Sequence, residues 1–322
     1  MTRAGFVGLA GRPNVGKSTL VNAIVGAKVA IVSDRPQTTR RAIRGIATDR
    51  SAGWQMVLVD LPGVQRPRDS LTQRMQRRVQ RELADADAAL LVVDGHQGVG
   101  PGDRFIAKAM LGAKQGTPVV CVVNKCDRLR RSQTAAALAA AAELEAVDEL
   151  FPVSARTGEG LEPLVLHLAS LLPEGPFAYP PEDRSDLPSE VHLAELVREQ
   201  VLRRTREEIP HAVEVVVEEV ERRQRAQGNE AEGAEAQGAE GDRSFGEAER
   251  SLVEVRAQIW VETQSQKGIL VGKGGRMVRE IGTAARKELE RDLGAHVFLD
   301  LQVKVREHWR RDDALLDRIG IE

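Results

Sequence analysis

Apolar runs and amphipathic stretches alternate along the first 172 residues of the chain. Short apolar runs predict strands at about 5–10, 42–48, 56–60, 88–93, 118–123 and 150–153. Apolar positions with helical spacing lie between these runs, at about 19–25, 70–84, 101–113, 133–146 and 160–172. This order predicts a doubly wound α/β domain over residues 1–173, with one antiparallel edge where residues 42–60 form two adjacent strands.

The pattern changes after this first domain. The segment from Leu172 to Pro181 is rich in Pro and Gly, so residues 174–186 are expected to link two domains. The remaining residues, 187–322, are expected to form a second domain of the α+β class. A length of 322 residues agrees with two domains, because it is too long for one typical domain.

The second domain has its own order of elements. A charged helix is expected at about 187–207 and a strand at 211–220, and alternating apolar residues predict strands at 253–261 and 297–305. A short apolar helix, the turn Gly272-Lys273-Gly274-Gly275 and a helix with one apolar face lie between the last two strands. Strand, helix, Gly-x-x-Gly, helix and strand form the core of a KH module, here preceded by an extra helix and strand.

Residues 222–250 differ in composition from the strands around them. Glu, Ala, Gly and Gln dominate, and seven acidic but only three basic side chains lie between Arg225 and Arg250. Such a segment buries too little apolar area to offset the entropy lost on ordering. We therefore expect a disordered excursion between two strands.

The composition narrows the class of protein. Apolar residues make up 42% of the chain and aromatic residues 3%, so Leu, Val, Ile and Ala must form the cores. The net charge of −2 gives no overall attraction to nucleic acid or membrane. Two cysteines indicate a reducing compartment, and no apolar run reaches the ~18–20 residues of a membrane span. We expect a cytoplasmic, monomeric protein without a signal peptide or a transmembrane segment.

The segment Gly11-Arg12-Pro13-Asn14-Val15-Gly16-Lys17-Ser18 lies between a predicted strand and the start of a helix. In this context a glycine-rich loop presents backbone N–H groups and the positive helix end to an anion. Lys17 is placed to reach the β- and γ-phosphates, and Ser18 to ligate Mg²⁺. The predicted phosphate-binding residues are Gly11, Asn14, Val15, Gly16, Lys17, Ser18 and Thr19.

The segment Asp60-Leu61-Pro62-Gly63 follows the apolar run at 56–60. Asp60 is expected to hold Mg²⁺ through water, and the Gly63 N–H to contact the γ-phosphate. When that phosphate leaves, the loop after Gly63 loses an anchor and can change its order. Ras-like GTPases have a Gln after this Gly that orients the attacking water. Val64 stands there in this chain, so we expect slow unaided hydrolysis.

The segment Asn124-Lys125-Cys126-Asp127 ends the β-branched run at 118–123, where parallel sheets place their ligands. The Asp127 carboxylate can accept hydrogen bonds from guanine N1–H and its 2-amino group, whereas adenine offers neither donor. Lys125 is expected to lie along the base, Asn124 to tie loops together, and Ser154-Ala155 to donate a backbone N–H to guanine O6. The sequence thus predicts GTP and GDP as ligands.

Basic side chains surround the Gly-x-x-Gly turn. Residues 253–311 contain twelve Lys and Arg against eight Asp and Glu, on a chain that is net negative. This local excess favours RNA binding. A plain helix–turn–helix with a solvated charged face remains an alternative. The predicted RNA-binding residues are Lys267, Gly272, Lys273, Gly274, Gly275, Arg276 and Arg279.

At this point the chain resembles the Era GTPases of bacteria over nearly its whole length. The most specific stretches are Arg35-Pro36-Gln37-Thr38-Thr39-Arg40, Thr205-Arg206-Glu207-Glu208-Ile209-Pro210 and Ser265-Gln266-Lys267-Gly268-Ile269-Leu270-Val271-Gly272-Lys273-Gly274-Gly275. The resemblance implies a P-loop GTPase domain with a doubly wound mixed sheet, followed by a type II KH domain. It also implies a role in small (30S) ribosomal subunit maturation, with the KH module bound to the 3′ end of 16S rRNA. Peripheral association with the inner membrane is a further implication.

The same resemblance assigns roles in the nucleotide site. The loop with Thr38 and Thr39 corresponds to the first switch, and Thr39, just before Arg40, corresponds to the residue that reaches Mg²⁺ and the γ-phosphate. Related GTPases hold K⁺ with an Asn like Asn14, so K⁺ is an expected second cation. The expected catalytic residues are Lys17, Thr39, Asp60 and Gly63, and the expected Mg²⁺ ligands are Ser18, Thr39 and Asp60.

Two departures from the family pattern are visible. Leu61 replaces the usual Thr, at a position whose side chain is not expected to contact nucleotide, and the acidic segment at 222–250 is atypical. Three functional hypotheses follow from the sequence: a GTP-dependent switch that binds RNA, a constitutive RNA-binding protein with a structural nucleotide, and a GTPase whose second domain docks protein.

Overall fold

The computed structural model describes residues 1–321 apart from 36–37, 65–67, 112–115 and 225–250. The described residues form two compact units. The first consists of Met1–Leu187 together with His308–Glu322, and the second of Pro188–Glu307. Within the described part of the chain, none of the helices combines the length and the apolar character needed to cross a bilayer.

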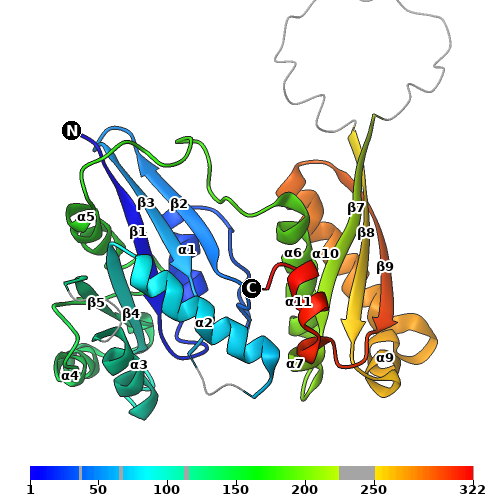
Figure 1. The fold of residues 1–322 in the computed structure, drawn as a ribbon, viewed down its shortest axis with the longest axis horizontal. Helices are drawn as coiled ribbons and strands as arrows, with labels where there is room; N and C mark the ends of the chain where they lie inside the picture. The colour runs from blue at the N-terminus through cyan, green and yellow to red at the C-terminus, as the bar shows by residue number, and fades with distance from the viewer. Residues whose placement is uncertain (36–37, 65–67, 112–115, 225–250, 322) are drawn as a thin grey trace, which may run out of the picture. The chain divides into compact units, whose positions relative to one another are not determined.

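The first unit is built on a six-stranded sheet with the order β2-β3-β1-β4-β5-β6 (Figure 1). β2 runs antiparallel to β3, and the other neighbours are parallel, so the predicted doubly wound sheet with one antiparallel edge is confirmed. The strands are β1 (Arg3–Ala10), β2 (Ile43–Asp49), β3 (Trp54–Asp60), β4 (Ala88–Asp94), β5 (Val119–Asn124) and β6 (Glu149–Pro152).

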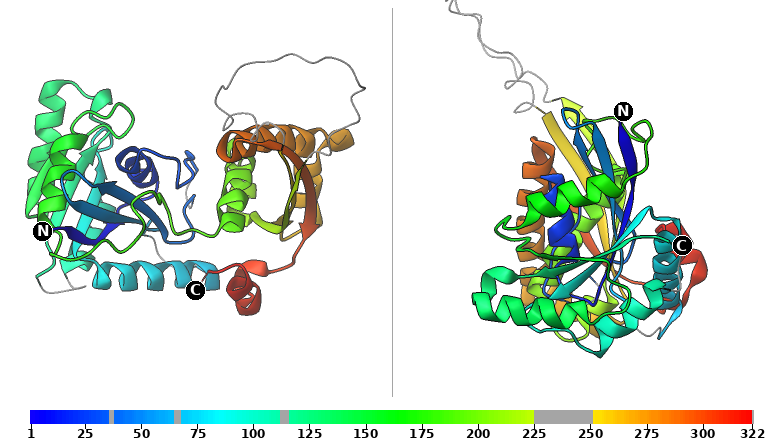
Figure 2. Two further views of the ribbon diagram at one scale, coloured as in Figure 1. Left: turned by 90° about the horizontal axis from the view of Figure 1, so that it is seen from above. Right: turned by 90° about the vertical axis from the view of Figure 1, so that its left-hand side faces the viewer.

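Helices cover both faces of this sheet (Figure 2). One apolar core joins the strands to α1 and α5, through residues such as Leu20 and Leu164. A second core joins the opposite face to α2, α3 and α4, through residues such as Leu83, Ile106 and Ala141. The helices are α1 (Lys17–Val25), α2 (Ser70–Asp85), α3 (Pro101–Leu111), α4 (Arg131–Ala142) and α5 (Leu161–Leu171), and η1 (Cys126–Arg128) is a 3₁₀ turn. Burial on both faces explains why β4 and β5 are apolar throughout.

The second unit contains a three-stranded sheet with the order β7-β8-β9. β7 is antiparallel to β8, and β8 is parallel to β9. The alternating residues of β8 from Val253 to Val261 are buried, which confirms the predicted apolar face. Helices α6 and α10 pack with this sheet and with each other. The elements are α6 (Ser189–Arg204), α7 (Ile209–Ala212), β7 (Glu214–Gln224), β8 (Ser251–Val261), α9 (Gln264–Val271), η2 (Lys273–Gly275), α10 (Arg276–Leu293) and β9 (His296–Val305).

Two expectations for the second unit need correction. The strand expected over 211–220 begins at Glu214, because Pro210 stands at the start of the short helix α7 and fits the first turn of a helix. The disordered segment expected over 222–250 begins too early, because Arg222 to Gln224 pair with β8 as part of β7. The rest of that segment, residues 225–250, lies outside the described residues.

The ends of the expected domains also differ from the observed division. The segment expected as a linker packs on the first unit, where Ser185 bridges to Gly45 and the Gln55 amide bonds to the backbone of Ala178 and Tyr179. The second domain was expected to extend to residue 322, whereas η3 (Trp309–Arg311) and α11 (Asp313–Arg318) pack with the first unit. The sequence contains no separate signal for this packing, because it depends on which distant residues receive the buried side chains.

Candidate guanine-nucleotide and RNA sites

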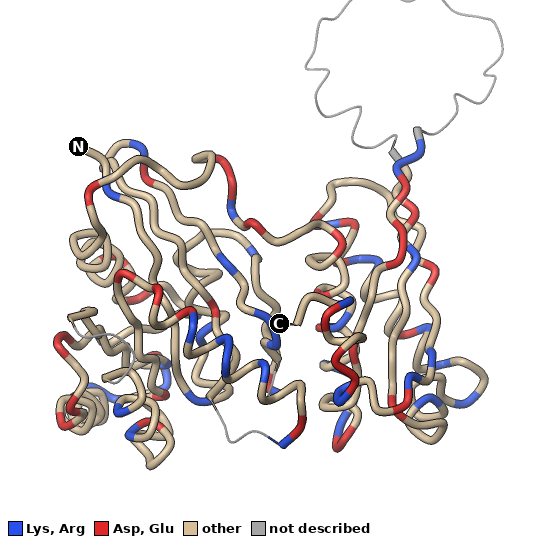
Figure 3. Tube along the Cα trace, in the orientation of Figure 1, with Lys and Arg blue, Asp and Glu red and all other residues tan. Residues whose placement is uncertain are grey.

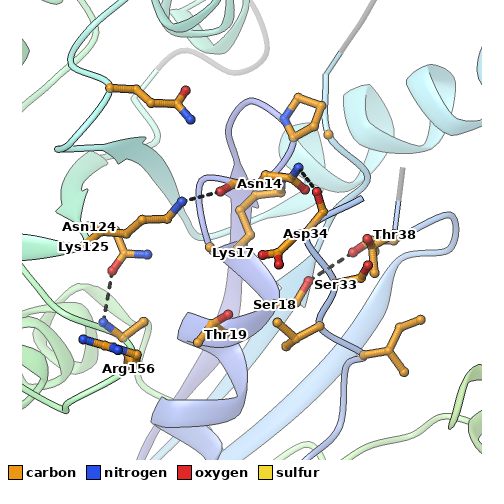
Figure 4. Close-up of a pocket in the computed structure, with 18 of the residues that line it drawn as sticks. Asn14, Lys17, Ser18, Thr19, Ser33, Asp34, Thr38, Asn124, Lys125 and Arg156 are labelled. Atoms are coloured by element: carbon orange, nitrogen blue, oxygen red, sulfur yellow. Dashed lines mark hydrogen bonds between the residues drawn. The ribbon is translucent and has the colours of Figure 1, made fainter. Parts of the chain in front are cut away.

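The four predicted nucleotide motifs meet at one cavity of about 500 Å³ (Figure 4). They follow the carboxyl ends of β1, β3, β5 and β6, which are the ends where open α/β sheets bind ligands. The predicted residues that line the cavity are Asn14, Gly16, Lys17, Ser18, Thr19, Thr39, Gly63, Asn124, Lys125, Asp127 and Ala155. Gly11, Val15, Asp60 and Ser154 do not line it, but each accepts or donates a hydrogen bond to a residue that does.

The phosphate loop has room only for glycine at two positions. Gly16 has a φ of 101°, and a Cβ there would lie 2.3 Å from Asn124 Nδ2. A Cβ at Gly11 would lie 2.5 Å from the carbonyl oxygen of Val92. The loop then enters α1 directly, so the first N–H groups of that helix are placed at the end of the cavity. This is the arrangement that binds phosphate.

Lys17 lies buried beneath the loop. Its Nζ donates to the carbonyl oxygens of Gly11 and Arg12, at 3.2 and 3.3 Å. Burial lowers the pKa of the Lys17 ammonium, and the nearby Asp60 charge partly opposes that effect. Burial deprives the ammonium group of hydration. Negatively charged phosphate oxygens at this position would stabilise its positive charge.

Three oxygen atoms converge beside Lys17, and all belong to the expected Mg²⁺ ligands. Ser18 Oγ donates to Asp60 Oδ2 at 2.6 Å, and Thr39 Oγ1 lies 3.1 Å from both Ser18 Oγ and Asp60 Oδ2. Thr38 Oγ1 instead donates to the Arg35 carbonyl at 2.7 Å. Two hydroxyls and one carboxylate are hard oxygen ligands of the kind that Mg²⁺ takes together with substrate phosphates. The residues present therefore fit this ion.

Asn124 and Lys125 hold the two halves of the cavity together. Asn124 Nδ2 donates to the Val15 carbonyl at 2.9 Å, and Lys125 Nζ donates to the Asn14 carbonyl at 2.7 Å. Lys125 Nζ also forms an ion pair of 2.7 Å with Asp94, at the carboxyl end of β4. Sequence reasoning missed Asp94, although its position at the end of a buried strand was a usable signal.

Asp127 is the predicted guanine-reading residue. Its Oδ1 accepts the Ser154 hydroxyl at 2.7 Å, and its Oδ2 is paired with Arg156 at 2.5 Å. The Ser154 hydrogen bond, followed by the Arg156 contact, lowers the pKa of the Asp127 carboxyl below its usual value. The group is therefore an anion that accepts hydrogen bonds at neutral pH. Arg156 was not predicted, although it directly follows Ser154-Ala155 in the sequence.

The backbone donors expected for guanine O6 already have acceptors. The Ser154 N–H donates to the Glu159 carbonyl at 2.9 Å, and the Ala155 N–H donates to Asn124 Oδ1 at 3.0 Å. A hydrogen bond from this pair to O6 thus requires the Ala155 N–H to be shared with the ligand or transferred to it.

The Gly-x-x-Gly turn of the second unit presents an open backbone. Gly272, Gly274 and Gly275 all have positive φ, and a Cβ at Gly274 or Gly275 would meet nothing within 4 Å. Lys273, Arg276 and Arg279 are exposed, and Lys267 is half-buried. Within the described residues only Arg276 of these cations forms an ion pair, with Glu280 at 3.6 Å. One basic residue, Lys267, lies in α9, Lys273 lies in the turn, and Arg276 and Arg279 lie at the start of α10, the region where Figure 3 shows Lys and Arg in blue.

Part of each unit matches a known protein family. Residues 6–125 match a family described as "50S ribosome-binding GTPase", and residues 242–310 match the KH domain family. GTPase Era of Mycolicibacterium smegmatis is 43% identical over 319 residues, covering 99% of this chain and 98% of its own length. GTPase Era of Mycobacterium tuberculosis is 44% identical, covering 98% of each chain.

Solved structures agree with these sequence comparisons. A crystal structure of Era in complex with MgGDPNP and nucleotides 1506–1542 of 16S ribosomal RNA has a TM-score of 0.87 and 31% identity, covering 100% of this chain and 99% of that one. An Aquifex aeolicus Era variant bound to GDP and AlF4⁻ has a TM-score of 0.85 and 31% identity, with 99% of each chain covered. With its nucleotide motifs, its KH topology and these full-length relatives, the chain belongs to the Era family of GTPases.

Proposed function

We propose that this GTPase is a molecular switch that binds the 3′ end of 16S rRNA through its second unit and assists maturation of the small ribosomal subunit. One observation carries the proposal: the chain that holds the guanine-nucleotide cavity also presents an open Gly-x-x-Gly backbone flanked by exposed cations. An Era protein that this chain matches over 99% of its length has been crystallised with a GTP analogue and with 16S rRNA nucleotides 1506–1542.

The nucleotide site supports GTP hydrolysis through residues that bind and orient. Ser18, Thr39 and, through water, Asp60 would hold Mg²⁺, which would neutralise charge on the phosphates of the bound nucleotide. Lys17 exchanges its two backbone carbonyl acceptors for phosphate oxygens. The Gly63 N–H contacts the γ-phosphate, and Gly63 packs so closely on Pro13 that a Cβ would lie 2.9 Å from the Pro13 ring. Loss of the γ-phosphate therefore affects a contact between the phosphate loop and the segment that contains Gly63.

Val64 cannot orient the attacking water by hydrogen bonding, so another group has to supply the missing organisation or charge. We propose K⁺ in this role, held by Asn14. The Asn14 side chain points to the first switch, where its Nδ2 donates to the Asp34 carbonyl at 2.7 Å. Turnover in KCl and in NaCl tests the proposal, and equal rates in the unmodified protein would dismiss K⁺.

The proposed switch requires reciprocal coupling. If GTP strengthens RNA binding by some factor, RNA must strengthen GTP binding by the same factor. RNA affinity is therefore measured with GDP and with a non-hydrolysable GTP analogue. Identical affinities would favour the constitutive RNA-binding alternative, in which Lys17→Ala loses nucleotide but keeps function in cells.

Crosslinking with sequencing of bound RNA, in both nucleotide states, identifies the partner. Reads concentrated at the 3′ end of 16S rRNA support the proposal, whereas reads on the large subunit would agree better with the description of the matched GTPase family.

Location in the cytoplasm, peripheral inner-membrane association and a monomeric state complete the proposal. Cell fractionation and light scattering of the purified protein test these three properties.

A further inference from the structure

The last residues of the chain are anchored in the nucleotide-binding unit, although they follow β9 of the other unit directly in sequence. We call residues His308–Glu322 the C-terminal segment. Trp309 and Leu316 in this segment are fully buried, and Ile319 and Ile321 are nearly so. Apolar side chains buried to this depth against a unit far away in sequence indicate a specific docking site.

The first docking contact lies next to the predicted Mg²⁺ ligand Thr39. The guanidinium carbon of Arg40 lies 5.5 Å from the centroid of the Trp309 ring, and only 2% of Arg40 is exposed. A cation over the face of an indole ring is attracted to it, more so where water is excluded. Arg41 adds two hydrogen bonds to the Ile319 carbonyl, at 2.9 and 3.1 Å. The two residues after Thr39 are thus both held by the C-terminal segment.

The second docking contact lies at the start of α2, shortly after Gly63 in the sequence. Arg310 is paired with Asp69, which caps the N-terminus of α2 by accepting the Thr72 N–H. Arg74 is paired with Asp317 at 2.5 Å and with Asp313 at 3.0 Å, and donates to the Ile321 carbonyl at 2.8 Å. One short segment therefore contacts the chain shortly after Thr39 and shortly after Gly63, which are two of the expected γ-phosphate contacts.

We infer that Trp309 is a positioning residue for GTP hydrolysis, which acts by fixing Arg40 and, through the adjoining peptide, Thr39. The Thr39 hydroxyl has to point toward Ser18 and Asp60, whereas the neighbouring Thr38 hydroxyl points to its own loop. Fixing the next residue in a buried cation–π contact selects between these arrangements. This inference rests on the proposed role of Thr39 as an Mg²⁺ ligand.

Steady-state hydrolysis by full-length variants tests the inference. Trp309→Leu keeps an apolar side chain but removes the ring face, Trp309→Phe keeps a ring, and Arg40→Gln removes the charge that Arg40→Lys keeps. Arg318→Gln is the matched control, because Arg318 is an exposed arginine of the same segment and forms no ion pair among the described residues.

We expect Trp309→Leu and Arg40→Gln to lower kcat by about 10- to 100-fold and to raise the Mg²⁺ concentration needed for half-maximal hydrolysis. GDP affinity should stay unchanged, because GDP lacks the γ-phosphate that Thr39 is expected to contact. Trp309→Phe and Arg40→Lys should recover part of kcat, and Arg318→Gln should behave like the unmodified protein. A purely structural role predicts lower thermal stability with unaltered kcat and Mg²⁺ requirement, which would overturn the inference.

Thr39→Ala separates this inference from the proposed function. If Thr39→Ala leaves the Mg²⁺ requirement unchanged, the proposed role of Thr39 is wrong and the inference falls with it. If Thr39→Ala raises that requirement while Trp309→Leu and Arg40→Gln do not, only the inference is wrong. Should Trp309→Leu fail to fold, the comparison of Arg40→Gln with Arg40→Lys decides by the same criteria.

Discussion

The two candidate sites of this chain recognise their ligands by different physical means. In the nucleotide site, Asn124, Lys125 and Asp127 each form hydrogen bonds of 2.5–3.0 Å with other protein groups. At the Gly-x-x-Gly turn, by contrast, the backbone at Gly274 and Gly275 faces open space. Of the predicted RNA-binding cations, Arg276 alone forms an ion pair among the described residues. Fixed geometry gives chemical selectivity, whereas open backbone and charge give affinity for a phosphate chain.

The glycines illustrate the same difference. In the phosphate loop, Gly16 is required both by its φ of 101° and by the nearby Asn124 side chain. In the second unit, Gly274 is required by its φ of 61° alone, because nothing lies within 4 Å of its missing Cβ. A tightly packed loop is thus already shaped for a small ligand, while the open turn leaves space for a large one to approach.

The largest effect is expected from Asp127→Asn. The amide would replace one acceptor with a donor facing guanine, so GTP affinity should fall by about 100-fold or more and xanthosine nucleotides should gain affinity. Isothermal titration with both nucleotides measures this. Glu145→Gln, at an exposed residue of the same unit, is the control. Retained GTP affinity in Asp127→Asn would contradict selectivity by fixed geometry.

A smaller effect is expected from the double variant Lys273→Ala/Arg279→Ala. Each lost phosphate contact to a single strand should reduce the slope of log affinity against log salt by about 0.7. RNA affinity should fall at every sequence tested, because the contacts proposed for these cations are to the RNA backbone and not to the bases. Lys287→Ala, at an exposed lysine farther along α10, should leave the slope unchanged. A salt-independent affinity in the unmodified protein would instead favour docking of a protein partner.

Gly274→Ala should have a modest effect on stability and a clear one on RNA. Its positive φ costs a residue with a Cβ about 1–2 kcal/mol, but no atom obstructs the new methyl group. The unfolding temperature should therefore fall only slightly. RNA affinity should fall clearly, because the methyl group prevents RNA from approaching the backbone. Unaltered RNA affinity, measured by filter binding, would show that the turn does not lie against the ligand.

The smallest effect is expected from pH. The pKa of the Asp127 carboxyl is held below its usual value, about 3.9, by Ser154 and then by Arg156. Any stability that the charged form contributes is present above the unfolded pKa and is lost only as pH falls through the lower folded value. Guanine affinity should thus show no titration of Asp127 between about pH 5 and 8. A drop in GDP affinity within this range that Asp127→Asn abolishes would contradict this expectation.

The sequence by itself determined the two folds and the location of the nucleotide site. Three local patterns illustrate this: apolar runs buried on both faces, a glycine loop before a helix, and Asn-Lys-x-Asp at the end of β5. Each pattern predicted a local structure that the fold contains. The alternation in β8 likewise reflects one buried sheet face. Such patterns can be recognised in the sequence because the residues that produce each local structure lie within a few positions of it.

Only the tertiary structure decided which distant residues meet. The Thr39 hydroxyl converges with Ser18 and Asp60 while that of Thr38 does not, and Arg156 pairs with Asp127. Trp309 lies beside Arg40 although 269 positions separate them (309 − 40). The physical reason is that burial and pairing of these side chains depend on packing between elements far apart in the chain, which no local pattern records.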